Sequence, residues 1–190
     1  MGRRVLILEM YSKVERIFYD RVFDMWSAIK KYFSYYPAQE KVAKLLLQYG
    51  LSVKKGGIYC ENIEVPALRI ARALGVDRRA VTVTVETISI NKELREFFEE
   101  LHPVPFFRDI AKIMGWGVVE IVPEDPAMTG ILAQVSKIIA DAGISIRQAI
   151  SEDPEFSEEA TLTIICEKDV PAILIPKIRK ATGVKKVVIH

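Results

Sequence analysis

The sequence predicts an α+β protein with a mostly helical first domain and a second domain of the order β-α-β-β-α-β. Three observations lead to this prediction. Apolar residues recur at helical spacing through most of residues 1–101, and short β-branched runs alternate with one-sided helices over residues 116–190. Between them lies a linker with a short helix, residues 102–115. Half of the 190 residues are hydrophobic, so a sizeable core is within reach.

The charge is divided unevenly along the chain. Residues 1–114 carry 19 Lys+Arg against 14 Asp+Glu, a balance of +5, and residues 115–190 carry 8 against 11, a balance of −3. A basic first part fits binding to a polyanion, and an ordinary solvated surface fits equally well.

Cysteine use and hydropathy indicate a cytoplasmic protein. Cys60 and Cys166 stand far apart, and neither they nor His102 and His190 have the spacing of metal ligands, so we expect reduced thiols, no metal and no cofactor. No apolar run approaches the roughly 18 residues of a membrane helix. The first residues lack the small-residue cleavage site of a signal peptide.

The first domain begins with helices. From Tyr11 to Tyr32, apolar residues at spacings of three and four predict a long helix, whose aromatic face belongs to the core or to a dimer interface. Pro37 ends this helix and opens the next one, which stops at Gly50. The apolar runs on either side of Lys-Lys-Gly-Gly, within residues 51–60, predict a small hairpin.

Residues 65–91 predict a helix-turn-helix. Pro66 opens a helix that Gly75 breaks, and Asp77 is a suitable N-cap for a second helix. The spacing of small, turn and branched residues fits the motif at Ile70, Ala71, Gly75, Val76 and Val81. The first helix is expected to bury Leu68, Ile70, Ala71 and Leu74.

The second helix of this motif is ambiguous. Residues 80–90 alternate and are rich in β-branched side chains, which by propensity predicts a strand. The cap at Asp77 and the surrounding pattern favour a helix. Thr84 stands where the motif usually has an aliphatic residue.

A further helix follows at residues 92–101, and a short one at residues 106–115 is expected to be capped by Gly115. In the second domain we expect strands at 118–122, 144–150 and 160–166 and at the end of the chain, with a one-sided helix at 131–142 that Gly143 caps. Asp169 is expected to cap the last helix, with Pro171 in its first turn. Pro176 implies a kink or a late start.

The second domain resembles an ACT domain, a ferredoxin-like module that binds small effectors. The resemblance rests on Asp125 before Gly130-Ile131-Leu132, on "IIADAGISIRQ" and on "ATLTIIC". The chain from about Trp26 to His190, without the first 25 residues, resembles an archaeal family of predicted regulators of amino acid metabolism, in which a helix-turn-helix, here winged-helix-like, precedes an ACT domain. The stretches "IEVPALRIARALGVDRRAVTVTVETI" and "GISIRQAISEDPE" carry that match.

The resemblance implies an amino acid effector at a homodimer interface, where ACT domains pair edge to edge. Backbone N–H groups of Gly130 and Ile131 would hold the carboxylate, as a helix N-terminus favours an anion. Further contacts are implied at Asp125, Thr129, Ser145 and Gln148. The common form has Asp or Asn where this chain has Ala127. A plain turn at Gly130 with a helix cap from Asp125 and Thr129 fits as well, and so does a surface ion pair for Arg147.

Three functions are compatible with these patterns. A regulator would bind DNA through the second helix of the motif and through the hairpin, with contacts from Arg78, Arg79, Thr82, Val83, Lys54 and Lys55. A helical module for protein contacts would instead suit an allosteric subunit that docks on a biosynthetic enzyme. An enzyme is disfavoured, because the sequence shows no nucleophile–base pair and no glycine-rich phosphate loop.

Overall fold

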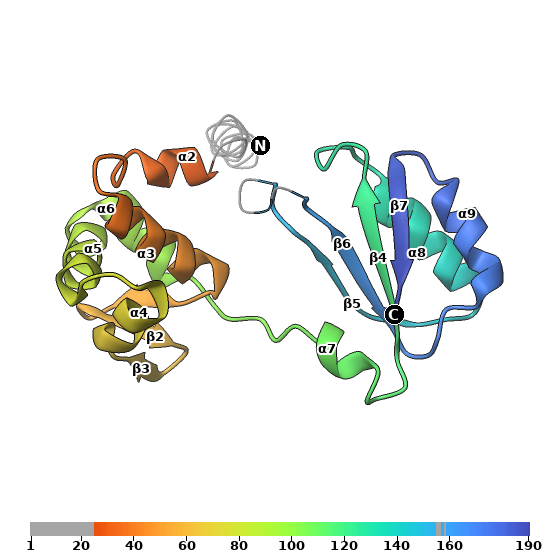
Figure 1. Cartoon of the computed structure of the whole chain (residues 1–190), viewed down its shortest axis with the longest axis horizontal. Coiled ribbons are helices and arrows are strands. Elements are labelled where there is room, and N and C mark those ends of the chain that lie inside the picture. Colours follow the sequence, from red (N-terminus) through yellow and green to blue (C-terminus); the bar gives the residue numbers. More distant parts are fainter. Residues whose placement is uncertain (1–24, 155–156, 158) are drawn as a thin grey trace, which may run out of the picture. The chain divides into compact units, whose positions relative to one another are not determined.

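The protein is an α+β protein, as the sequence predicts, and its chain divides into two compact units (Figure 1). The computed structural model describes residues 25–154, 157 and 159–190. One unit extends to Val104, and the second spans Pro105–His190. No helix in the described residues is long and apolar enough to cross a membrane. Most of the helix predicted from Tyr11 to Tyr32 lies outside the described residues.

The first unit packs helices around a small antiparallel sheet. The helices are α2 (Met25–Lys30), α3 (Pro37–Gln48), α4 (Ala67–Leu74), α5 (Arg78–Ile90) and α6 (Lys92–Glu99), and the strands are β1 (Ser52–Lys54), β2 (Gly57–Cys60) and β3 (Ile63–Val65), paired in that order. The predicted hairpin is β1–β2, whereas β3 was not predicted. The largest side chains of this core with no exposed surface are Phe33, Leu46, Ile88 and Phe98.

The ambiguous segment after Asp77 is helix α5. The Asp77 carboxylate accepts a hydrogen bond from the Arg79 backbone N–H at 2.7 Å, as expected of an N-cap. Hydroxyl groups along the helix donate to the carbonyl four residues earlier, for example Thr84 to Ala80 at 2.7 Å. Burial of Val81 and Ile88 against the unit then outweighs the strand propensity.

Thr84 is fully buried at the position where an aliphatic residue was expected. Its bond to Ala80 satisfies the hydroxyl, so the core accepts it. The expected burial of Leu68 is wrong. That side chain is 43% exposed and Leu74 is half-buried, whereas Ile70 and Ala71 are buried as expected.

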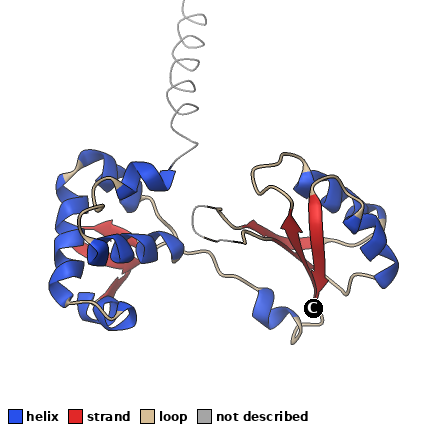
Figure 2. Ribbon diagram, turned by 45° about the horizontal axis from the view of Figure 1, so that its top comes forward, coloured by secondary structure: helices blue, strands red, loops and turns tan. Residues whose placement is uncertain are grey.

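The second unit is a four-stranded antiparallel sheet with the strand order β5-β6-β4-β7. Its elements follow the predicted order: β4 (Gly117–Pro123), α8 (Ile131–Asp141), β5 (Ile146–Ser151), β6 (Leu162–Cys166), the 3-10 helix η2 (Ala172–Leu174), α9 (Ile175–Arg179) and β7 (Val184–Ile189). Helices α8 and α9 lie together on one side of the sheet (Figures 1 and 2).

The other side of the sheet is partly covered by helix α7 (Arg108–Ala111). Ala111 packs with Val118 and Ile165, together with the rings of Phe107 and Trp116. Side chains alternate across a strand, so these residues face away from the core that Val119 and Ile164 form under α8 and α9. The sheet therefore has a buried patch on both faces.

Of the expected helix ends, the cap at Asp169 differs from the structure, whereas the late start at Pro176 and the end at Gly115 agree with it. Asp169 caps no helix, because η2 begins after Pro171 and makes no side-chain cap bond. Helix α9 starts late, so Pro176 lies in its first turn, where a missing N–H costs nothing. Helix α7 ends at Ala111, and the turn that continues it closes at Gly115, which has φ 68°; the Trp116 N–H donates to the Ala111 carbonyl and the Gly115 N–H to the Lys112 carbonyl, as expected of a capping glycine.

Gly50 allows a close approach of two backbone segments in the first unit. It has φ 60°, and a Cβ at this position would lie 2.8 Å from Pro103 N and closer still to the His102 carbonyl. We expect Gly50→Ala to lower the free energy of unfolding by about 2–5 kcal/mol, from the left-handed conformation and the overlap together.

Gly75→Ala is the matched control for this change. Gly75 has φ 63° with nothing within 4 Å of the added atom, so its cost should be only about 1–2 kcal/mol. Urea unfolding of both variants measures the difference. Equal losses would show that the contact with His102 and Pro103 carries no energy.

Candidate functional site

The start of α5 presents four of the predicted DNA-contacting residues on the surface of the first unit. Arg78, Arg79 and Thr82 are exposed, and Val83 is 41% exposed. The Thr82 hydroxyl donates to the Arg78 carbonyl at 3.3 Å, which sets its rotamer along the helix. The first two turns of α5 thus offer two guanidinium groups and two methyl-bearing side chains to a partner.

Packing of α4 against α5 holds these turns in place. Gly75 joins the two helices in the left-handed conformation, and the Val76 backbone N–H donates to the Ala71 carbonyl at 3.0 Å. Ala71 and Val81 are buried at the contact. The angle at which α5 leaves α4 is therefore fixed by a tight turn and a small residue.

The predicted lysines sit at the β1–β2 hairpin. Lys55 and Gly56 form its two-residue turn, and both have positive φ, 52° and 73°, which is the pattern of a type I′ turn. Lys54 is half-buried, with its ammonium 5.4 Å from the centre of the Tyr59 ring. Lys55 is exposed and extends from the end of the hairpin.

A hollow of about 690 Å³ lies between this hairpin and α5. Arg78 and Thr82 line it, as does the backbone of Gly56, so the structure brings the helix and the hairpin to one surface. Glu64 and Glu86 line the same hollow. The surface therefore combines basic and acidic groups and is not uniformly suited to a polyanion.

In the second unit, hydrogen bonds hold the loop between β4 and α8 in a defined conformation. The Asp125 carboxylate accepts from the Ala127 backbone N–H at 2.9 Å, and the Glu124 N–H donates to the Gly183 carbonyl at 2.8 Å. Thr129 is exposed, and Gly130, with φ 89°, is the N-cap of α8. Asp125 thus acts as a turn-forming residue in this structure.

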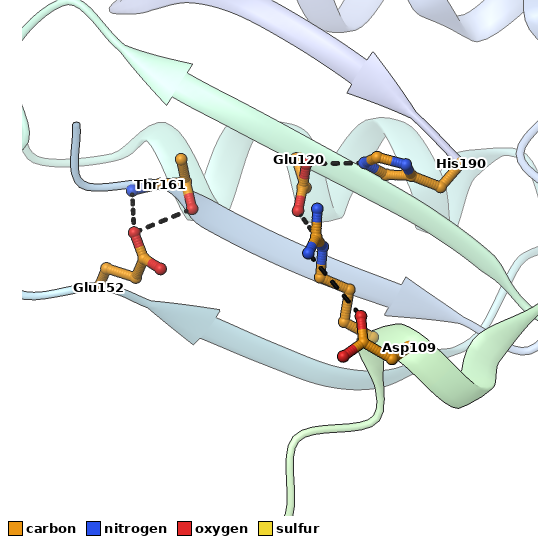
Figure 3. Close-up of polar contacts among 6 residues, drawn as sticks. Asp109, Glu120, Glu152, Thr161 and His190 are labelled. Atoms are coloured by element: carbon orange, nitrogen blue, oxygen red, sulfur yellow. Dashed lines mark hydrogen bonds and ion pairs between the residues drawn. The ribbon is translucent and has the colours of Figure 1, made fainter. Parts of the chain in front are cut away.

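Beside this loop is a small pocket of about 130 Å³. Gly130 and Ile131 line it from the loop side, and Glu152 and Thr161 line it from the ends of β5 and β6. The Glu152 carboxylate accepts from the Thr161 N–H and hydroxyl at 3.0 and 3.2 Å (Figure 3). The pocket within one chain has room for little more than the charged end of a small ligand.

Ser145 and Gln148, also predicted at the effector site, do not line that pocket. The Ser145 backbone N–H donates to Glu167 at 3.3 Å. The Gln148 amide is occupied by the main chain of the segment before α7: it donates to the Pro105 carbonyl at 2.8 Å and accepts from the Phe107 N–H at 3.1 Å. Within one chain, the six predicted effector residues thus lie in two separate places.

A cluster of charged side chains that the sequence did not reveal surrounds Glu120 of β4, on the face of the sheet that α7 partly covers. Glu120 contacts Nε of Arg108 from α7, and its other oxygen lies 2.7 Å from Nε2 of His190 (Figure 3). Burial alone raises the pKa of Glu120, but hydrogen bonds from His190 and Arg108 and their charge outweigh it and hold the pKa below its ordinary value of 4.5. In the sequence, the only sign of this cluster was one acidic residue, Glu120, within a strand of β-branched residues.

Among the described residues, the cysteines form no disulfide and the potential metal ligands form no cluster. Burial, with a smaller contribution from the charge of Glu167, raises the pKa of the Cys166 thiol to about 11, so it stays protonated and unreactive. Cys60 is also a free thiol. No group of three His, Cys, Asp or Glu side chains among the described residues could hold a metal ion.

Comparisons with known proteins do not assign a family. No family model matches the chain, and no curated protein matches it. One solved structure, titled "Crystal structure of PH0061", is 14% identical and covers 80% of this chain and 88% of its own, with a TM-score of 0.28. A likeness at that level carries no argument about fold or function.

The lowered pKa of Glu120 predicts a specific loss of stability in acid. The carboxylate stabilises the fold fully above its ordinary pKa, and this contribution disappears as the pH falls through the lowered value. We therefore expect the stability difference between the wild type and Glu120→Gln to shrink as the pH falls from about 5 towards 3.

Urea unfolding across that pH range measures the difference. Asp109→Asn is the control, because Asp109 faces the same arginine at 3.8 Å but is 91% exposed, so its effect should be small. A Glu120→Gln difference that does not change with pH would contradict the ion-pair explanation.

Proposed function

We propose that the protein is a ligand-responsive regulator that binds DNA through α4–α5 and a small effector of the amino acid class through its second unit. The observation that carries the proposal is the first turn of α5. It is capped by Asp77 and held by a tight turn, and it presents Arg78, Arg79 and Thr82 to solvent. A side chain at such a position reaches base edges or phosphates when the helix enters a major groove.

The arrangement of α4 and α5 supports a helix-turn-helix. The glycine turn, the small Ala71 and the buried branched side chain of Val81 are the features that this motif requires. Lys55, at the end of the β1–β2 hairpin, is available for a phosphate contact beside α5, in the manner of a wing. In this chain the hairpin precedes the motif.

The strand order of the second unit supports a ferredoxin-like ACT domain. In this proposal the effector carboxylate binds to the backbone N–H groups of Gly130 and Ile131 at the start of α8, where the helix dipole favours an anion. Because the pocket there is only about 130 Å³, the rest of the ligand needs a second surface. A partner subunit would provide that surface.

The alternative is a non-DNA-binding allosteric subunit that docks on a biosynthetic enzyme. Its support comes from the hollow beside α5, where Glu64 and Glu86 would repel phosphate. Leu68 and Ile90 line the same hollow and are 43% and 80% exposed, which suits a protein partner. DNA binding separates the two functions.

The double variant Arg78→Ala, Arg79→Ala should weaken binding to a mixed-sequence DNA duplex at least tenfold. Because each arginine is expected to neutralise one phosphate, the slope of log affinity against log salt should also fall by about 2, at ~0.9 per phosphate. Fluorescence anisotropy across a salt series measures both quantities.

Lys92→Ala, Arg95→Ala is the matched control. It removes the same charge from exposed positions on α6, and its salt slope should remain that of the wild type. Unchanged binding in the Arg78, Arg79 variant would rule out α5 as the recognition helix. A wild-type protein that does not bind DNA at low salt would favour the docking subunit.

We also propose that the chain is a homodimer. A helix-turn-helix protein usually reads two half-sites, and the effector pocket needs a second wall. Light scattering at micromolar concentration should therefore give twice the mass of the 21.5 kDa chain. A monomer would remove both the paired half-sites and the two-subunit pocket.

A further inference from the structure

A second hollow in the second unit, of about 430 Å³, lies where β5 begins. This volume is within the range of pockets that bind small molecules, whereas the pocket beside the β4–α8 loop is below it. The hollow is lined by Phe107, Trp116, Ser145, Ile146, Arg147 and Glu167. It contains one positive side chain, one negative side chain and an aromatic wall.

The positive side chain is held by stacking rather than by an ion pair. The Arg147 guanidinium lies 4.3 Å from the centre of the Trp116 ring. Within the described residues, Arg147 interacts with Trp116, and no carboxylate or carbonyl accepts a hydrogen bond from its guanidinium group. A stacked guanidinium keeps its planar edge of donors available, and that edge matches a carboxylate in a bidentate pair.

The negative side chain is positioned by the main chain of Ser145. One carboxylate oxygen of Glu167 accepts the Ser145 N–H at 3.3 Å, and the Glu167 N–H donates to the Ser145 carbonyl at 3.0 Å. The second oxygen remains available for a cation. Glu167 and Arg147 do not pair with each other in the described structure, although both line the hollow.

The aromatic wall is preformed. Phe107 packs edge-on against Trp116, with ring centres 6.1 Å apart. Gln148 fixes the segment that carries Phe107, through its bonds to Pro105 and to the Phe107 N–H. A wall that is already ordered does not have to be ordered by the ligand, which favours binding.

We propose that this hollow binds a small zwitterion with an apolar side chain, such as an α-amino acid. Arg147 holds the carboxylate, Glu167 holds the ammonium group, and Phe107 contacts the apolar side chain. A ligand with only one of these charges would meet a like charge at the other side chain, which disfavours it. The site is separate from the one proposed at Gly130 and Ile131 and competes with it as the place where the amino acid binds, and it does not depend on whether the chain binds DNA.

Calorimetric titration of the full chain tests the ligand class. The probes are L-phenylalanine and two analogues that each lack one charge: 3-phenylpropanoate lacks the ammonium group and 2-phenylethylamine lacks the carboxylate. L-leucine and L-alanine test the apolar side chain. We expect L-phenylalanine to bind, and both analogues to bind at least tenfold more weakly than it does.

Variants then locate the site. Arg147→Ala and Glu167→Gln should each raise the dissociation constant at least tenfold, because each removes one charged partner. Arg179→Ala, at an exposed arginine on α9, is the control for charge and should bind as the wild type does. In a Trp26→Phe background, Trp116 is the remaining tryptophan, and its fluorescence should change at saturation with the same dissociation constant.

Met128→Ala separates this site from the loop pocket, which Met128 lines. Binding that is lost in Met128→Ala and kept in Arg147→Ala would overturn the inference and leave the effector in the loop. No binding by any of the three amino acids at millimolar concentration, or equal binding by the single-charge analogues, would also overturn it. Amino acid binding without DNA binding would support this site and contradict the proposed regulator.

Discussion

The second unit depends on the burial of β6 from both faces of its sheet. Every residue from Leu162 to Cys166 is buried. A sheet with helices on one side normally leaves its other side to water, so this strand requires a second cover. Helix α7 and the residues around it provide that cover. They bring Arg108 to Glu120 and Trp116 to Arg147, and both polar arrangements therefore follow from a packing requirement.

In the first unit, one helix, α5, belongs to the core on one side and is exposed at its start. Val81, Val85 and Ile88 fix one side of α5 by burial, while its first turn remains accessible. A short glycine turn gives this helix little freedom relative to α4. Rigid presentation of a few exposed side chains is what recognition of any shaped partner requires.

Much of the fold could be predicted from the sequence, because periodicity and turn residues are local signals. At the ambiguous segment α5, the Asp77 cap, which acts within two residues, was the local signal that favoured a helix. Sequence placed Gln148 at an effector site, but its bonds to Pro105 and Phe107 span more than 40 positions. The pairing of Trp116 with Arg147 spans fewer positions but also depends on strand register and on a covering helix. A pattern in a single sequence does not predict such long-range contacts.

The irregularity in β5 limits how the sheet can extend into a neighbour. Arg147 is an extra residue between two that pair with consecutive positions of β6, so the outer edge of β5 is interrupted there. The regular stretch of β5 that a strand from another molecule could pair with is therefore limited to residues 148–151. The opposite edge, β7, carries exposed Lys185 and Lys186, which discourage strand addition. Sheet pairing between molecules is thus confined to the short regular stretch of β5, which can serve a closed pair of subunits but not a growing fibril.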